Sequence, residues 1–251
     1  MTGGATRALE QVGSFSILVA RSAREAVRRR PEGAVVLDQL YHLGVLSVGI
    51  ATITALFTGM VLAIQTSYSL AAYGAKFFVG DIVSLSIVRE LGPVLTALMV
   101  GGRVGAGITA EVGTMNVTEQ IDAIRALASS PIRKLVVPKV IAIVIMLPVL
   151  VVLSDFVGIM GGFLMAVTSL NQPGAFYMQH VIKAIHPEDI LSGLGKTVVF
   201  ALLIAFIACY KGLTATGGAD GVGRATTETV VASSLSILIS DFFLTKLFLA
   251  F

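Results

Sequence analysis

Long apolar stretches separated by short polar segments fill most of this chain. A helix needs about 20 residues to cross the hydrocarbon core of a bilayer. We predict five membrane spans, at residues 43–64, 82–113, 135–170, 197–210 and 229–249. The fourth is short for a span unless it begins near Ile190. The pattern predicts an all-α integral membrane protein.

The first 34 residues follow a different pattern. The apolar run at residues 15–20 is too short to cross a membrane, and arginines follow it from Arg21 to Arg30. A cleaved signal peptide carries its positive charges before the apolar run. We therefore predict an amphipathic helix over Leu9–Arg30 that lies in the membrane interface and ends at Pro31. The predicted domains are this interfacial segment, residues 1–34, and a membrane domain, residues 35–251.

A short polar helix is predicted between the second and third spans, at residues 116–129. Asn116 is a suitable N-cap residue, and Glu119 stands three positions later, as in a capping box. Apolar side chains from Val117 to Ala128 recur at spacings of three and four, which places them on one face. Such a helix suits docking into a groove of a partner protein, or it connects two spans along the membrane surface.

Charged residues inside the predicted spans are costly and must be paired, lie near an end, or face water. The candidates for an intramembrane charge network are Arg89, Glu90, Arg103, Asp155 and Asp241. Arg103 and Glu111 are eight positions apart and fall on one helical face. These residues form a gate or relay, or they fix the register of the helices. Pro93 predicts a kink just after Glu90.

Composition agrees with a membrane protein. Of the 251 residues, 55% are hydrophobic and 13% are charged, whereas soluble domains carry about 25% charged residues. Lys and Arg residues number thirteen in segments 1–40, 103–139 and 211–228, against four in the alternate segments. The positive-inside rule then places the N-terminus in the cytoplasm and the C-terminus outside.

Several other functions are not supported by the sequence. Gly193–Thr197 resembles the end of a phosphate-binding loop, but Ile190 stands where that motif requires glycine. The histidines are scattered, so no metal site is predicted. No nucleophile and base are suitably spaced, so no catalytic residue is predicted. The basic residues flank spans instead of forming a stripe, which argues against nucleic-acid binding.

Four motifs of this chain resemble those of the MlaE/YrbE permease family. They are Arg89–Pro93, Gly102–Gly105, Glu111–Ile124 and Arg224–Thr227. The resemblance covers about residues 35–251. It implies a permease subunit of an ABC transporter that moves phospholipids between the inner and outer membranes of bacteria.

The resemblance also implies partners. A second permease copy would complete a dimer in the bacterial inner membrane, with ATPase subunits on the cytoplasmic side and an MCE-domain protein in the periplasm. This chain would bind no cofactor itself, while the ATPase would use ATP and Mg. The short polar helix would be the coupling helix, and the residues expected to serve the ATPase contact are Glu111, Glu119, Gln120, Asp122 and Arg125.

The resemblance places the phospholipid at the dimer interface, near the outer ends of the first, second and fifth spans. The candidate lipid-binding residues are Gln65, Tyr68, Leu70 and Tyr73. The residues alone also allow a transporter driven by an ion gradient, with a relay formed by Arg89, Glu90, Asp155 and Asp241. A membrane scaffold without transport activity is a third possibility.

Overall fold

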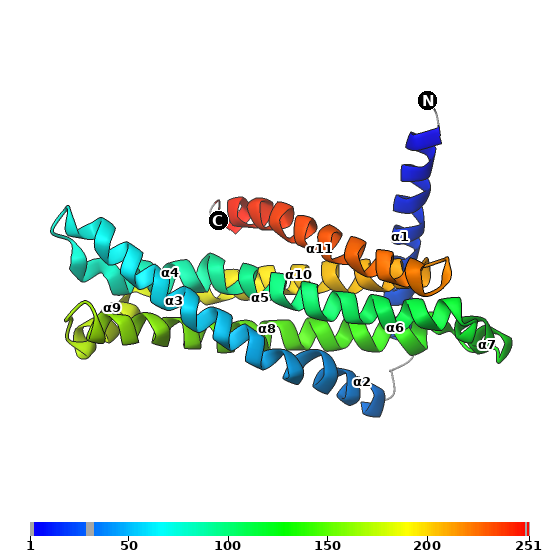
Figure 1. Cartoon of the computed structure of the whole chain (residues 1–251), viewed down its shortest axis with the longest axis horizontal. Helices are drawn as coiled ribbons and strands as arrows, with labels where there is room; N and C mark the ends of the chain where they lie inside the picture. The colour runs from blue at the N-terminus through cyan, green and yellow to red at the C-terminus, as the bar shows by residue number, and fades with distance from the viewer. Residues whose placement is uncertain (1–2, 29–32, 249, 251) are drawn as a thin grey trace. The chain divides into compact units, whose positions relative to one another are not determined.

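The structure, a computed structural model, describes residues 3–28, 33–248 and 250. This part of the chain is helical almost throughout and contains no strand (Figure 1). Five helical segments in it are long and apolar enough to cross a membrane: Gly33–Ala71, Lys76–Val117, Ile132–Thr168, Pro187–Leu213 and Gly218–Phe248. The predicted all-α membrane fold with five spans is confirmed.

Most spans are assembled from several consecutive helical pieces. In chain order the pieces are α1 (Gly3–Arg28), α2 (Gly33–Gln39), η1 (Leu40–Gly44), η2 (Val45–Ser47), α3 (Val48–Ala71), η3 (Lys76–Phe78), α4 (Val79–Ser86), η4 (Ile87–Leu91), α5 (Gly92–Val100), η5 (Gly101–Gly105), α6 (Ala106–Val117), α7 (Gln120–Ala126), η6 (Ile132–Val136), α8 (Val137–Thr168), α9 (Gly174–Ala184), α10 (Pro187–Leu213) and α11 (Gly218–Phe248). Of the η pieces, η2 and η3 are 3-10 helices, and the other four are π-helical turns.

The N-terminal helix is confirmed as α1, whereas its placement in the membrane interface stays a prediction. Its predicted end at Pro31 falls outside the described residues. The predicted domain boundary between residues 34 and 35 likewise stays a prediction. A further helix, α9, lies between the third and fourth spans.

The predicted start of the short polar helix was wrong. Helix α6 continues through Asn116 to Val117, and α7 begins only at Gln120. Asn116 does not cap a helix; its Nδ2 donates a hydrogen bond to the carbonyl oxygen of Ala215, 3.0 Å away. Glu119 is the residue just before α7. Its backbone is in the left-handed region, with φ +60°, and its side chain makes no capping hydrogen bond.

The boundaries of the last two spans also differ from the prediction. The fourth begins at Pro187, and the fifth begins at Gly218 instead of after a long glycine-rich turn. Pro187 suits the first turn of a helix because its missing N–H has no intrahelical partner there. The turn before α11 uses positive φ angles at Gly217 and Gly218. Small residues then continue the helix, with Val222 and Ala225 packed against Ala215.

The chain divides into two compact units. Unit 1 comprises residues 1–44, 101–145 and 201–236, and unit 2 comprises residues 45–100, 146–200 and 237–251. The helices α8, α10 and α11 contribute residues to both units.

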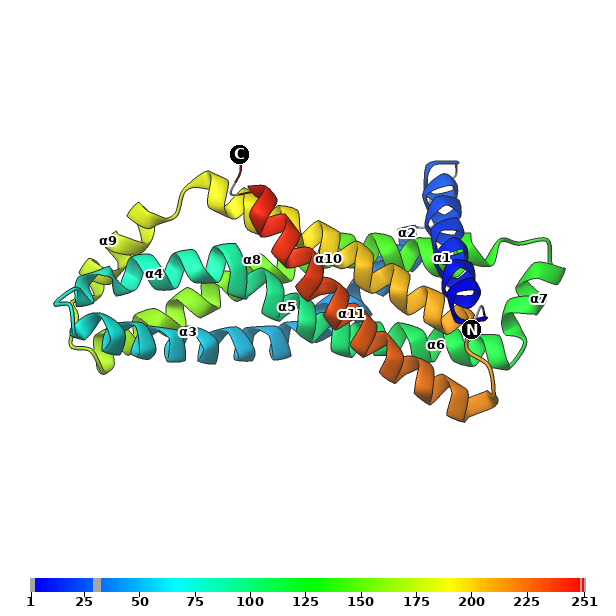
Figure 2. The same ribbon diagram turned by 90° about the horizontal axis from the view of Figure 1, so that it is seen from above.

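Unit 1 is held together by a buried hydroxyl pair and by close helix contacts. The hydroxyl groups of Thr109 and Thr229 lie 2.8 Å apart, and Thr109 also bonds to the carbonyl of Ala208. Helix α1 packs against η6, and its Phe15 ring meets the Tyr210 ring edge to face at 5.7 Å. Helix α7 follows α6 in the chain (Figure 2).

Unit 2 depends on glycines that let α3 and α8 approach closely. A Cβ atom on Gly59 would overlap the carbonyl of Gly158, and one on Gly161 would overlap the carbonyl of Leu56. Such small residues allow membrane helices to pack backbone to backbone.

Helix α9 packs against the rest of unit 2 through α4. It lies beside α4 (Figures 1 and 2), and His180 Nδ1 is 2.8 Å from the Asp81 carboxylate. Tyr177 of α9 is almost fully buried in the core formed with Val79 and Val83. Burial raises the pKa of the Tyr177 hydroxyl above its ordinary value, because it disfavours the charged form.

The α3–α8 contact yields a stability prediction. Gly59→Ala places a methyl group against the Gly158 backbone, so we expect a loss of about 1–3 kcal/mol. Gly49→Ala on the same helix meets no atom within 4 Å, and we expect no loss, or a gain of up to about 1 kcal/mol from helix propensity. Thermal unfolding of the purified protein in detergent measures both. Equal transition temperatures for the two variants would contradict this packing.

Candidate functional site

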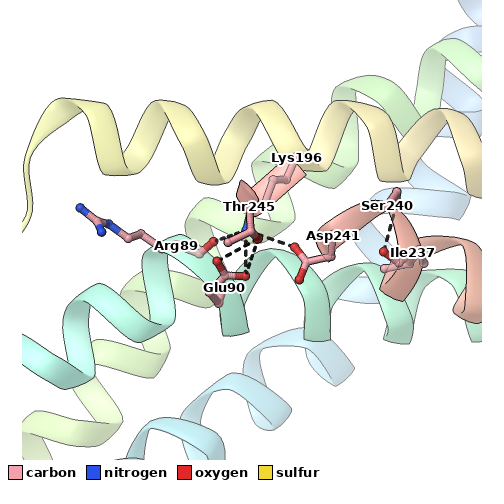
Figure 3. A network of polar contacts seen from close by, with 7 residues as sticks. All are labelled: Arg89, Glu90, Lys196, Ile237, Ser240, Asp241 and Thr245. Carbon is pink, nitrogen blue, oxygen red and sulfur yellow. Dashed lines mark hydrogen bonds and ion pairs between the residues drawn. The ribbon is translucent and has the colours of Figure 1, made fainter. Parts of the chain in front are cut away.

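A buried lysine holds three helical pieces of unit 2 together. Lys196 of α10 is 1% exposed, and its Nζ lies 2.8 Å from Glu90 Oε2 and 3.1 Å from Asp241 Oδ1 (Figure 3). It also donates a hydrogen bond to Thr245 Oγ1 at 2.7 Å. Glu90 comes from η4, and Asp241 and Thr245 stand one turn apart on α11. We call Glu90, Lys196, Asp241 and Thr245 the lysine network.

The predicted proline kink contributes directly to this network. Pro93 has no N–H, so it cannot bond to the carbonyl of Arg89 four residues earlier. Lys196 Nζ donates to that carbonyl instead, at 3.0 Å. The π-helical turn η4 spans the same residues, Ile87–Leu91. The sequence feature that interrupts the helix thus creates an acceptor for the buried ammonium.

A glycine sets the distance between α10 and η4. Gly193 precedes Lys196 by three residues and so shares its face of the helix. A Cβ atom on Gly193 would overlap the carbonyl of Val88. The two backbones therefore touch at this point, which brings Lys196 within reach of Glu90.

The side chain of Arg89 belongs to a neighbouring ion pair. Figure 3 shows its guanidinium pointing away from the lysine network. It pairs with Asp189, with Nε 2.5 Å from Oδ1. Asp189 is 3% exposed and also accepts a hydrogen bond from the backbone N–H of His186. This pair joins η4 to the first turn of α10.

Two pockets border the lysine network. One, of about 370 Å³, is lined by charged and polar side chains, including Arg89, Glu188 and Lys196. The other, of about 510 Å³, combines Asp241 and Lys246 with apolar Leu238 and Phe242. Glu90 and Thr245 line both. Such mixed surfaces suit a ligand with a charged group and an apolar body.

Unit 1 contains a second buried lysine. Lys139 of α8 is 2% exposed and donates to Glu111 Oε2 at 2.7 Å and to Gln39 Oε1 at 2.9 Å. These bonds join α8 to α6 and to α2. Glu111 is therefore part of a link between three helices of this unit.

Comparison with known proteins identifies the family. The family model described as Permease MlaE matches residues 36–247. This chain belongs to the MlaE permease family. It is 43% identical to a probable ABC transporter permease protein of Rickettsia bellii, over 96% of this chain and 93% of the relative. A probable ABC transporter permease protein of Synechocystis is 47% identical over 84% of this chain and 80% of the relative.

A plant relative is more distant. The chloroplastic protein TRIGALACTOSYLDIACYLGLYCEROL 1 of Arabidopsis thaliana is 38% identical over 84% of this chain and 61% of its own length. The resemblance stated from the sequence motifs is confirmed: the chain is a multi-pass ABC transporter permease of the MlaE family.

The structure separates the residues predicted to form one charge network in this permease. Glu90 and Asp241 meet at Lys196, and Arg89 lies beside them. Arg103 lies in η5 of unit 1. Asp155 forms no ion pair within the described part of the chain, and its Oδ1 is buried without a hydrogen-bond partner there. A Cβ atom on Gly92 would overlap this carboxylate.

The predicted coupling residues of this permease occupy exposed positions on or beside α7. Glu119 and Gln120 are exposed, and Asp122 forms a 2.7 Å ion pair with Arg125 in which both side chains are more than half exposed. Glu111 is also exposed, although it bonds to Lys139.

The predicted lipid-binding residues of this permease lie near the end of α3. Tyr68 and Tyr73 are 85% and 83% exposed, and Gln65 is exposed. Leu70 instead packs against the core cluster around Val79. The roles of these residues stay predictions.

Sequence reasoning missed Lys139, Asp189 and Lys196 of the permease. Lys196 was placed before the fourth span because the predicted span began at Thr197. Two signals could have found it: the orphan carbonyl that Pro93 creates at Arg89, and the surplus of carboxylates at Glu90 and Asp241. Lys139 stands in a plainly apolar run, where a lysine requires a partner.

The lysine network yields a second stability prediction. Lys196→Met leaves Glu90 and Asp241 close together without a cation, and we expect a loss of about 3 kcal/mol, since both carboxylates keep some exposure. Lys211→Met removes a more exposed pair with Glu228, and we expect a loss below about 1 kcal/mol. Thermal unfolding in detergent compares them. Partial recovery in Lys196→Met/Asp241→Asn would support the pairing, and equal losses in the two single variants would refute it.

Proposed function

We propose that this chain is the membrane subunit of an ABC transporter that moves phospholipids between the inner and outer membranes of bacteria. The observation that carries the proposal is a buried charge network bordered by two pockets of mixed polarity, in a chain that belongs to the MlaE permease family. The Arabidopsis relative is named after a lipid, trigalactosyldiacylglycerol, and this name supports a lipid as the transported cargo.

The pockets suit a phospholipid because it joins a charged headgroup to hydrocarbon chains. Ser86, Ser192 and Thr245 offer polar groups to a headgroup, while Leu238, Phe242 and Phe248 offer apolar surface to the chains. Tyr68 and Tyr73 then stand as exposed aromatic residues where a lipid can enter. Lipid burial is strongly favourable, at roughly 0.8 kcal/mol for each CH₂ group. Release of the lipid therefore requires an external source of energy.

A second permease copy is the proposed partner within the membrane. The first and fifth spans are the least buried. In an apolar stretch of 18 residues within each of them, 17% and 11% of the residues are buried, against 44–50% in the other three spans. Exposed apolar residues recur at helical spacing on α3, at Ile53, Phe57 and Val61, and on α11, at Leu235, Leu238 and Phe242. A second copy would cover such faces, and the lipid would lie between the copies.

The energy would come from an ATPase that docks on α7. This chain binds no cofactor in the proposal; ATP and Mg belong to the ATPase. Closure of the ATPase would push α7, and α6 would pass the motion to α8 through the Glu111–Lys139 bond. The π-helical turn η5 precedes α6, and such turns are frequent at functional sites. An MCE-domain protein would receive the lipid on the opposite face.

The orientation follows from charge. With α7 in the cytoplasm, seven Lys or Arg residues lie in the segments before and between the observed spans on the inside, against one, Lys183, on the outside. The N-terminus is then cytoplasmic and the C-terminus periplasmic, in the bacterial inner membrane. The relatives named as bacterial ABC transporter permeases support this location.

The ion-driven alternative receives less support. It needs a relay through Arg89, Glu90, Asp155 and Asp241, yet Arg89 pairs with Asp189, and Asp155 has no ion pair among the described residues. Membership in an ABC permease family also favours ATP as the energy source.

Charge reversal on α7 tests the coupling role. Glu119→Lys/Asp122→Lys reverses two exposed charges, and we expect at least about a tenfold loss of bound ATPase, because misplaced like charges at an interface cost several kcal/mol. The control Lys76→Glu/Lys183→Glu reverses two exposed charges in unit 2. Co-purification and ATP-dependent lipid transfer between vesicles are measured for both. Unchanged assembly and transfer in the α7 variant would exclude the coupling role.

Cysteine labelling tests the orientation. The native Cys209 is fully buried, so it gives little background. In intact spheroplasts we expect a membrane-impermeant maleimide to label Tyr73→Cys at once, and Gln120→Cys only after the membrane is opened, because the two positions would face opposite sides. Both positions are exposed. The reverse order of labelling would invert the proposed topology.

A further inference from the structure

An arginine-rich pocket lies in unit 1. It has a volume of about 440 Å³ and is formed by α1, the end of α10 and the chain from α7 to η6. Four arginines line it: Arg21, Arg24 and Arg28 from α1, and Arg125 from α7. Neither the proposed ATPase coupling nor the lipid path requires this pocket.

The pocket has an excess of positive charge. Glu25 is the only acidic residue among the described residues that line it, and Arg125 already pairs with Asp122 at 2.7 Å. Arg21, Arg24 and Arg28 are exposed and form no ion pair within the described residues. Three guanidinium groups are thus available to an anion. Guanidinium groups bind phosphate oxygens in pairs, which makes arginine well suited to phosphate recognition.

The position of the pocket indicates where the anion comes from. Ile132, the first residue of the third span, and Leu213, the last residue of the fourth, both line it. The pocket therefore lies at the level where spans leave the hydrocarbon and lipid headgroups begin. Leu18, which is buried, and the partly buried Pro131 add apolar surface to the pocket wall. Cations above an apolar wall match an amphiphile better than a soluble ion.

We propose that this pocket binds the phosphate headgroup of an anionic phospholipid from the adjoining leaflet. Exposed Val12 and Ile17 on α1 would enter the same interface, as in other amphipathic helices with a basic face. The site rests on the membrane-spanning assignment and does not depend on the transported cargo or its direction. An acidic face of a partner protein would also meet arginines, but it would not need apolar walls at the ends of two spans.

A lipid in this pocket would link α1 to α7. Helix α1 already packs on η6, and Arg125 reaches the pocket from α7, the predicted coupling helix. One headgroup that contacts arginines from both helices would hold them together. The leaflet's content of anionic lipid would then influence the helix proposed to meet the ATPase.

The test compares two pairs of substitutions in the full chain. Arg21→Gln/Arg24→Gln removes two pocket arginines, and Arg133→Gln/Lys134→Gln removes two nearby charges that do not line the pocket. Native mass spectrometry counts phosphatidylglycerol and phosphatidylcholine retained by each purified protein. We expect the pocket pair to lose at least about tenfold in phosphatidylglycerol affinity, since each basic residue near an anionic surface contributes a factor of about five. The control pair should stay near the native value.

Other outcomes would overturn the proposal. Equal losses in both pairs would indicate a diffuse charge effect. No preference of the native chain for phosphatidylglycerol over phosphatidylcholine would exclude an anionic lipid site. Displacement of the lipid by millimolar inorganic phosphate would identify a soluble phosphate as the ligand. Loss of the co-purifying ATPase from the pocket pair, with phosphatidylglycerol binding unchanged, would assign the arginines to a protein interface.

Discussion

A single buried ammonium group determines much of how unit 2 is arranged. A charge within a membrane-crossing helix is tolerated only when nearby groups replace its water. Lys196 obtains a carboxylate from Glu90, a carboxylate from Asp241, a hydroxyl from Thr245 and a backbone carbonyl from Arg89. Because these groups come from η4 and α11, neither piece can slide along α10 without separating a charge from its partner. The network therefore fixes the register of these helices.

Glycines supply the close approach that the charges need. Gly193 brings the α10 backbone against Val88, and Gly59 and Gly161 do the same between α3 and α8. Dispersion forces act in both contacts, but only the first also sets the distance of an ion pair. Unit 2 thus combines a polar contact that defines register with apolar contacts that define spacing. If the helices move during transport, the ion pairs at Lys196 and the glycine contact that sets their distance would have to be kept together or broken together.

The sequence predicted the fold class because apolar length and charge placement are local properties. The five spans and helix α1 follow from such runs, and the family follows from four short motifs. The boundaries near Asn116 could not be predicted, because its side chain bonds to Ala215, which is 99 positions away. Lys196 was missed for the same reason: its partner Glu90 is 106 positions distant. Asp155 was grouped with Asp241 on charge alone, and only the fold shows that it lies against Gly92.

The pairing of Pro93 with Lys196 has an evolutionary consequence. The proline removes an N–H from the helix, and the lysine takes over the carbonyl that this N–H would have satisfied. If the lysine were lost first, the Arg89 carbonyl would lose the hydrogen bond that Lys196 donates to it. If the proline were lost first, a new N–H would compete for the acceptor. The lysine is therefore harder to exchange than the proline, because its loss also leaves the carboxylates of Glu90 and Asp241 without a cation, and all three acceptors are encoded far from it in the gene.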